Sequence, residues 1–172
     1  MYIEFFVEEE SMEIALEILL PKIIGDVDFA IRTFDGKYDL LRELPRRLRG
    51  YQWKKTHDDW CIVVLIDEER QDCHELKQRL ETIAHDAGYA TRTTNPDTFH
   101  VINRIVIEEL EAWFFGDVAA LHAAYPRVDL KLGGKAPYRY PDTIKGGTKK
   151  ALALVLKRDH PGGLEKKRAA RE

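Results

Sequence analysis

The amino-acid sequence predicts an α/β fold, in which a mostly parallel, four-stranded sheet is flanked by helices. Two observations predict this fold. The segment from Trp60 to Ile66, WCIVVLI, is a continuous apolar run that ends at an aspartate, which is typical of a strand buried on both faces of a parallel sheet. Segments with strand character also alternate with segments of helical periodicity, which favours right-handed βαβ crossovers.

The individual elements follow from periodicity and from residues that begin or end helices. Ser11 is expected to cap the first helix, and Gly25 and Gly88 are expected to end two helices. Pro45 interrupts an otherwise helical segment. Strands are expected at residues 1–7, 28–34, 60–66 and 99–107. Helices are expected at residues 12–24, 38–48, 71–87, 108–115, 118–124 and 149–157.

A length of 172 residues is enough for one domain with a substantial buried core. We expect an α/β core over residues 1–124 and a basic loop and helical extension over residues 125–172, forming one domain overall. The final segment, GLEKKRAARE, resembles the beginning of a helix that continues in relatives, so a shortened chain is one interpretation.

The sequence contains none of the usual signals for export or membrane insertion. No apolar run approaches the roughly 20 residues that a bilayer span needs, and the N-terminal segment lacks the basic region of a signal peptide. Cys61 falls in a predicted strand and Cys73 in a predicted helix, which favours reduced thiols. We therefore expect a cytoplasmic protein with no membrane partner.

Charge is unevenly divided along the chain. Residues 1–120 carry 14 basic and 25 acidic side chains, a net charge of −11, whereas residues 121–172 carry 13 and 5, a net charge of +8. These blocks favour an acidic site in the first part and an anion-facing surface in the last part, although a basic block is equally consistent with a solvated surface.

Acidic residues follow two of the predicted strands directly. Glu8 comes after the first strand, and Asp67, Glu69 and Asp72 come after the third. If these strands are neighbours, their carboxyl ends meet at the edge of the sheet where α/β proteins bind ligands. Clustered carboxylates favour a hard cation such as Mg²⁺ or Mn²⁺ over zinc, while the alternative is that they cap helices or face water.

A further acidic pair follows the fourth predicted strand. Glu108 and Glu111 lie three positions apart, so in a helix they would share one face and could complete the metal site. The alternative is that they complement the dipole of the helix they begin. Nearby, Trp113, Phe114 and Phe115 are typical of core residues more than of a surface that stacks on bases.

Glycine and basic residues gather in two loops of the last third. Glycine lets backbone N–H groups approach an anion, and basic side chains add charge, so these loops resemble phosphate-binding segments without matching a Walker A motif. Such contacts with nucleic acid would be sensitive to salt and independent of sequence, while flexible surface loops are the alternative. The candidate phosphate-binding residues are Lys135, Arg139, Lys145, Gly146, Gly147, Thr148, Lys149 and Lys150.

Several segments also carry a family resemblance. The segments VEEESMEIALEILLPKIIG, VVLIDEERQDC and NRIVIEELEAWFFGD resemble a bacterial Toprim-like, RloG-like family of unknown function that is often encoded beside an ATPase. The resemblance covers nearly the whole chain, and a more distant one links it to OLD-type Toprim nucleases. It implies a Toprim-like fold, which is a Rossmann-like arrangement of sheet and helices.

The resemblance also implies roles for the acidic residues. Glu8 takes the position of the general acid or base, Asp67 and Glu69 those of the metal ligands, and Asp72 that of an auxiliary acid. Two positions depart from the Toprim pattern, because Glu9 replaces a glycine and Glu69 replaces an aspartate.

The resulting expectation is a divalent-metal-dependent phosphodiesterase or nuclease of a bacterial defence or mobile-element system. Two alternatives remain open. One is a non-catalytic Toprim-like module that partners an ATPase, and the other is a nucleotide-binding regulator.

Overall fold

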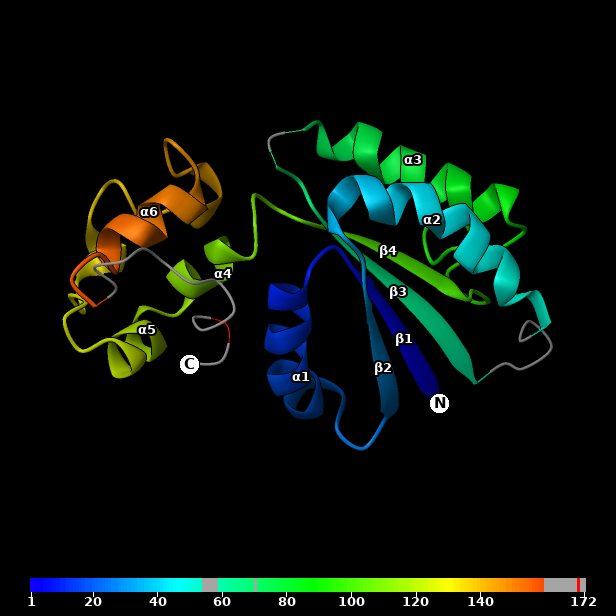
Figure 1. Ribbon diagram of the computed structural model, residues 1–172, viewed down its shortest axis with the longest axis horizontal. Coiled ribbons are helices and arrows are strands. Elements are labelled where there is room, and N and C mark those ends of the chain that lie inside the picture. The colour runs from blue at the N-terminus through cyan, green and yellow to red at the C-terminus, as the bar shows by residue number, and fades with distance from the viewer. Residues whose placement is uncertain (54–58, 70, 160–169, 171–172) are drawn as a thin grey trace. The chain divides into compact units, whose positions relative to one another are not determined.

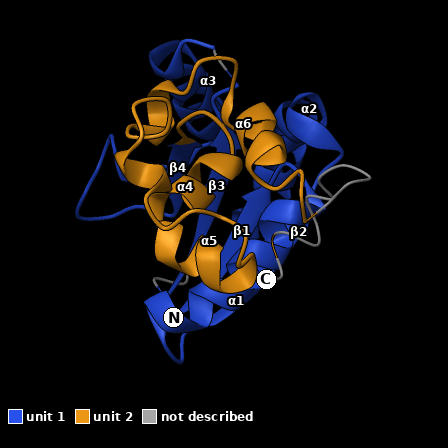
Figure 2. Ribbon diagram, turned by 90° about the vertical axis from the view of Figure 1, so that its left-hand side faces the viewer, with its two compact units in different colours: residues 1–105 blue, residues 106–172 orange. Residues whose placement is uncertain are grey.

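The fold of residues 1–53, 59–69, 71–159 and 170 is described by a computed structural model. The end of the chain that was expected to begin a further helix lies almost entirely outside these residues. The chain divides into two compact units, residues 1–105 and residues 106–172, which Figure 2 distinguishes by colour. The division falls nearer the N-terminus than the expected boundary between residues 124 and 125.

The first unit confirms the predicted α/β class. Its sheet has four parallel strands in the order β2-β1-β3-β4, where β1 is Tyr2–Val7, β2 is Asp28–Thr33, β3 is Trp60–Asp67 and β4 is Val101–Val106. Helices α1 (Glu10–Ile24), α2 (Gly36–Gly50) and α3 (Cys73–Asp86) connect the strands in turn. Figure 1 shows α2 and α3 on one face of the sheet and α1 on the other.

The main core lies between the sheet and the helices α2 and α3. Its apolar side chains come from positions that the strand and helix periodicities place on facing surfaces, and Phe6 and Ile66 belong to the strands that carry the acidic residues. Burial of this kind anchors the carboxyl ends of β1 and β3 firmly. Fully buried members of the core include Phe6, Leu44, Ile62, Ile66, Leu80 and Val101.

Two details of the helices differ from the predictions. Helix α1 begins at Glu10 and its N-cap is Glu9, so the prediction that Ser11 caps it is wrong. The Ser11 hydroxyl instead donates a hydrogen bond to the Glu9 carboxylate at 2.8 Å. Helix α2 continues through Pro45 to Gly50 because four buried leucines hold its apolar face on the core, which offsets the lost backbone hydrogen bond.

The second unit is helical. It contains α4 (Glu111–Gly116), α5 (Val118–Ala124), the short 3₁₀ helices η2 (Leu132–Gly134) and η3 (Pro141–Thr143), and α6 (Thr148–Val155). These elements share their own core, whose buried members include Phe115, Leu121, Leu132, Leu152 and Leu156. Because α4 and α5 contribute to this core, they belong with the basic segment and not with the sheet.

The aromatic run of α4 divides between core and surface. Phe115 is buried and stacks on Tyr138 with ring centroids 5.6 Å apart, and Phe114 packs against the same core, whereas Trp113 is 40% exposed. The core interpretation therefore holds for the two phenylalanines. In the described part of the chain, no helix is both long and apolar enough to cross a bilayer.

Candidate functional site at the carboxyl edge of the sheet

The candidate site lies where the strand order of the sheet reverses. After β1 the chain forms β2 on one side of it and then crosses to form β3 on the other side. In sheets of this kind, ligands bind beyond the carboxyl ends of the strands at the point of reversal, which here lies between β1 and β3. The two strands pair in parallel with Val7 opposite Leu65, which confirms that they are neighbours.

Glu8 and Asp67 meet at this edge. Asp67 is the last residue of β3, and its backbone N–H donates a hydrogen bond to Glu8 Oε1 at 2.7 Å. Both residues are 7% exposed, so two acidic residues are buried side by side at the end of the sheet. This contact joins positions that are 59 residues apart in the sequence.

Burial raises the pKa of the Glu8 carboxyl to about 7. The hydrogen bond from Asp67 and the positive charge of Lys37 act in the opposite direction, while the nearby Glu69 and Glu9 raise the pKa further. With a pKa near neutrality, the Glu8 carboxyl is able both to accept and to donate a proton under physiological conditions.

Lys37 is part of this site although the sequence analysis did not identify it. It lies in the first turn of α2, and its Nζ donates a hydrogen bond to the Glu68 carbonyl oxygen at 3.1 Å and forms an ion pair with Glu69 Oε2 at 3.1 Å. The side chain is only 10% exposed. The preceding residue, Gly36, has φ of 85° and donates its N–H to the Glu8 carbonyl oxygen at 2.9 Å.

The signal for Lys37 was present in the chain as the sequence Asp35-Gly36-Lys37. This turn follows β2 after one intervening residue, Phe34, and β2 pairs in parallel with β1. In a parallel sheet the residues that follow neighbouring strands lie at the same edge, so the turn falls beside Glu8. Lys37 could be assigned to the site only once the order of the strands was known, and a single sequence does not give that order.

The other acidic residues after β3 are engaged differently. Glu69 has a left-handed backbone, with φ of 49°, and its half-exposed carboxylate pairs with Lys37. Asp72 is the N-cap of α3, where its carboxylate accepts hydrogen bonds from the N–H groups of His74 at 2.8 Å and Glu75 at 3.1 Å. These bonds lower the pKa of Asp72. Its place in the fold is therefore that of a helix cap.

Glu108 and Glu111 belong to the second unit. The prediction that they share one helical face is wrong, because Glu108 has φ of 63° and precedes the first residue of α4. A left-handed residue at this position ends the extended chain and turns it into the helix, so Glu108 lies outside the helical register. Glu111 begins α4 and is 2% exposed.

Residues 1–53, 59–69, 71–159 and 170 contain no group of three or more His, Cys, Asp or Glu side chains arranged to hold a metal ion. Mg²⁺ usually takes one or two protein carboxylates and completes its shell with water and substrate phosphates, so Asp67 supplies the kind of ligand that this ion takes. Of the acidic residues expected at the site, Glu8 and Asp67 are the two that the sheet brings together.

The basic loops of the second unit have internal partners. Lys135 forms an ion pair with Asp129 at 2.8 Å, and Arg139 donates a hydrogen bond to the Gly134 carbonyl oxygen at 3.2 Å. At the start of α6, Glu109 Oε2 accepts hydrogen bonds from the Lys149 N–H at 3.2 Å and the Thr148 hydroxyl at 3.3 Å. The anion at this helix N-terminus is therefore a carboxylate of the protein itself.

Gly146 and Gly147 precede α6 with φ of 92° and 93°, values that residues with side chains rarely adopt. They bring the chain to the helix start, and Thr148 is fully buried there. Lys145, Lys149 and Lys150 are exposed. The loop thus has glycines with the positive φ typical of anion-binding turns, and the anion beside it is the Glu109 carboxylate of the same chain.

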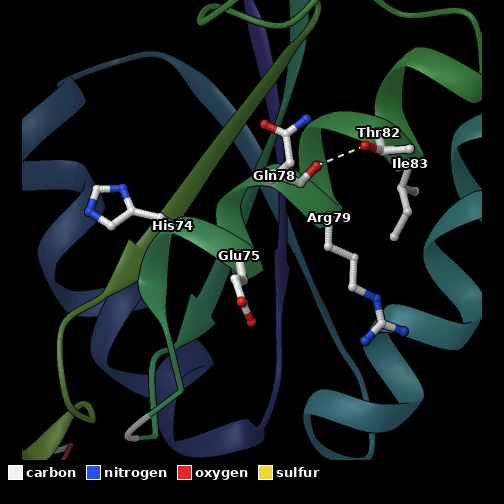
Figure 3. Close-up of a pocket in the computed structure, with 6 residues that line it drawn as sticks. All are labelled: His74, Glu75, Gln78, Arg79, Thr82 and Ile83. Carbon is white, nitrogen blue, oxygen red and sulfur yellow. Dashed lines mark hydrogen bonds between the residues drawn. The ribbon is translucent and has the colours of Figure 1, made fainter.

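An open hollow also lies along α3. It is lined by residues of that helix alone, two of which are joined by a hydrogen bond from the Thr82 hydroxyl to the Gln78 carbonyl oxygen at 2.9 Å (Figure 3). Neither Glu8 nor Asp67 lines it. Its lining residues are His74, Glu75, Gln78, Arg79, Thr82 and Ile83.

The model of a protein family described as a domain of unknown function, DUF4276, matches residues 7–172. The chain belongs to this family. Searches among curated proteins and among solved structures gave no match. The DUF4276 match includes Glu8, Lys37 and Asp67 and extends through both units. The family description assigns no activity, so the Toprim-like resemblance stays a prediction.

Proposed function

We propose that this DUF4276 protein is a divalent-metal-dependent phosphodiesterase that cleaves nucleic acid. The observation that carries the proposal is the buried contact between Glu8 and Asp67 at the point where the strand order reverses. Ligand sites of α/β proteins occupy this position, and the two acidic residues are suited to phosphoryl chemistry with Mg²⁺ or Mn²⁺.

The two residues have different roles in this proposal. Asp67 holds the divalent ion, which when bound stabilises the negative charge that develops on a phosphodiester. Glu8 transfers a proton, for which its pKa of about 7 is well suited. Burial beneath the sheet edge keeps the two carboxyl groups in fixed positions, which general acid–base catalysis requires.

The resemblance described from the sequence supports a finer proposal. On that basis the enzyme is a nuclease of a bacterial defence or mobile-element system and acts with an ATPase encoded nearby. A non-catalytic, Toprim-like module that docks on the ATPase is the second candidate. The Lys37–Glu69 ion pair favours it, because this pair engages a carboxylate that the resemblance assigns to the metal.

Cleavage assays test the proposal. Plasmid, linear and single-stranded DNA and RNA are incubated with wild-type protein in Mg²⁺ or Mn²⁺, and with the Glu8→Gln and Asp67→Ala variants. Loss of a positioned general acid or base is expected to reduce the rate by about 10²-fold to 10⁴-fold. Asp72→Asn is the matched control, since asparagine retains the helix cap while removing the charge.

The expected result is cleavage by the wild-type and Asp72→Asn proteins and its loss in the other two variants. Equal cleavage by Asp67→Ala and wild type would contradict the proposal. No cleavage of any substrate by the wild-type protein would favour the binding module.

A further inference from the structure

We propose that Lys37 binds a phosphate oxygen of the substrate, an inference that rests on the phosphodiesterase function proposed above. Neither the sequence pattern nor the family description assigns a role to this residue. It lies in the first turn of α2, and its neighbour Gly36 is hydrogen bonded to the backbone of Glu8. Lys37 is therefore fixed to the same sheet edge as the two buried acidic residues.

The placement of the ammonium group is unusual for a lysine. Long basic side chains ordinarily extend their charged end into water, yet the Lys37 side chain is 10% exposed. The ammonium is held in place by a hydrogen bond to the Glu68 carbonyl oxygen and by an ion pair with the Glu69 carboxylate, both at 3.1 Å.

The charges around the site explain why a cation is needed. Glu69 and Glu9 both raise the pKa of the Glu8 carboxyl, so these three acidic groups lie within electrostatic range of one another. A phosphodiester that approaches them is repelled unless a positive charge is already in place. Lysine is a common phosphate ligand because it is a compact point charge.

Glu69 shows how substrate can reach Lys37. Its carboxylate is 49% exposed, so it can move into water, and in the absence of substrate it presents to the ammonium the same kind of anionic oxygen as a phosphate does. The Lys37–Glu69 pair is therefore the ligand-free form of the phosphate site, with the carboxylate displaced when a phosphate binds.

Lys77 offers a matched control elsewhere in the same unit. Like Lys37, it donates a hydrogen bond to a backbone carbonyl oxygen, that of Asn103 at 2.6 Å, and pairs with a glutamate, Glu81, at 2.8 Å. Glu81 is itself buried and accepts a further bond from the Asn103 amide at 3.0 Å. Lys77 thus stabilises the α3–β4 contact without an exposed carboxylate to displace.

The experiment measures binding of a fluorescein-labelled single-stranded oligonucleotide in EDTA, where cleavage does not occur, over a range of salt concentrations. The proteins are the full-length wild type, Lys37→Met, Lys37→Arg, Glu69→Gln and Lys77→Met. Each phosphate contact contributes about −0.7 to the slope of log Kobs against log[salt] for single strands. Loss of one contact therefore changes the slope as well as the affinity, which a purely structural effect does not do.

Lys37→Met is expected to bind the oligonucleotide about tenfold more weakly than wild type, and the magnitude of its salt slope is expected to fall by about 0.7. Lys37→Arg and Lys77→Met are expected to keep the wild-type slope. Glu69→Gln leaves Lys37 in place and removes the carboxylate that competes with phosphate for it, so this variant is expected to bind at least as tightly as wild type.

A slope in Lys37→Met equal to that of Lys77→Met overturns the inference, as does weakened binding in Glu69→Gln. Binding that depends on Lys37 but leads to no cleavage with Mg²⁺ or Mn²⁺ refutes the proposed function and leaves the phosphate site standing.

Discussion

Burial of the Glu8 carboxyl makes the stability of the folded chain depend on pH. The pKa rises from 4.5 to about 7 on folding, so the folded state holds this proton more tightly than the unfolded state. The resulting stabilisation is fully present below pH 4.5 and is lost as the pH rises through 7. A shift of this size corresponds to at most about 3 kcal/mol in the free energy of unfolding.

Glu8→Gln removes this dependence because the amide does not ionise. We expect the variant to gain stability relative to wild type between pH 4 and pH 8, as measured by urea denaturation at both values. Glu17→Gln, on the exposed surface of α1, controls for the loss of one carboxylate. A difference between Glu8→Gln and wild type that is the same at both pH values would show that folding leaves the pKa of Glu8 unchanged, which would contradict the prediction.

At the scale of residues, the sequence predicted Glu8 and Asp67 because both come directly after strands with a clear signal. An apolar run that stops at an acidic residue marks the end of a buried strand, and parallel strands bring such ends together. The cap at Asp72 is a local contact, and it matches the alternative interpretation of the acidic residues as helix caps. The contact of Lys37 with Glu68 joins distant segments, so it depends on strand order and loop conformation, which periodicity does not contain.

The cap of α3 gives a prediction for a single element. Asp72→Ala removes the acceptor for two backbone N–H groups and is expected to lower the free energy of unfolding by about 1 kcal/mol. Asp72→Asn keeps an acceptor at this position and is expected to keep most of the stability of the wild-type protein. Urea denaturation of both variants measures the difference. Equal stability of the two variants would mean that the Asp72 side chain contributes nothing as a cap.

The start of α6 gives a second prediction at this scale. The Glu109 carboxylate occupies the helix N-terminus where the sequence predicted a phosphate. Glu109→Gln removes the competing charge, so we expect tighter binding of a single-stranded oligonucleotide at low salt and slight destabilisation of the helix. Joint neutralisation of Lys145, Lys149 and Lys150 is expected to weaken that binding and reduce its salt dependence.

Fluorescence anisotropy across a salt series measures both effects. An affinity that ignores salt, or that survives neutralisation of the three lysines, would contradict a nucleic-acid contact at this loop. Unchanged affinity in Glu109→Gln would show that the helix N-terminus takes no phosphate even when the carboxylate is gone.

The elements themselves were predicted with unequal success. Helices with a long apolar stripe and strands with continuous apolar runs were found within a few residues of their ends. The segment from Glu108 to Leu110 was predicted as the beginning of a helix, yet Glu108 has a left-handed backbone and α4 begins only at Glu111. A single left-handed residue interrupts a right-handed helix, and periodicity gives no sign of it.

The whole molecule should respond to a divalent ion if the proposed site is correct. An ion that binds only the folded state adds about 2.7 kcal/mol at a free concentration of about 100 times Kd, which is enough to raise Tm by several degrees. We expect this shift in the wild-type protein with Mg²⁺ or Mn²⁺ and little shift in Asp67→Ala. Equal shifts in both proteins would place the ion elsewhere in the chain.

The pairing of β1 with β3 also has a consequence for synthesis on the ribosome. At about 5–20 residues per second, roughly 3 to 12 seconds separate the appearance of Glu8 from that of Asp67, 59 positions later. During this interval the central strand of the sheet lacks one neighbour, and Glu8 is a solvated, ionised glutamate. The nascent chain therefore carries Glu8 as an ordinary carboxylate, whose pKa rises to about 7 only when the sheet closes around it.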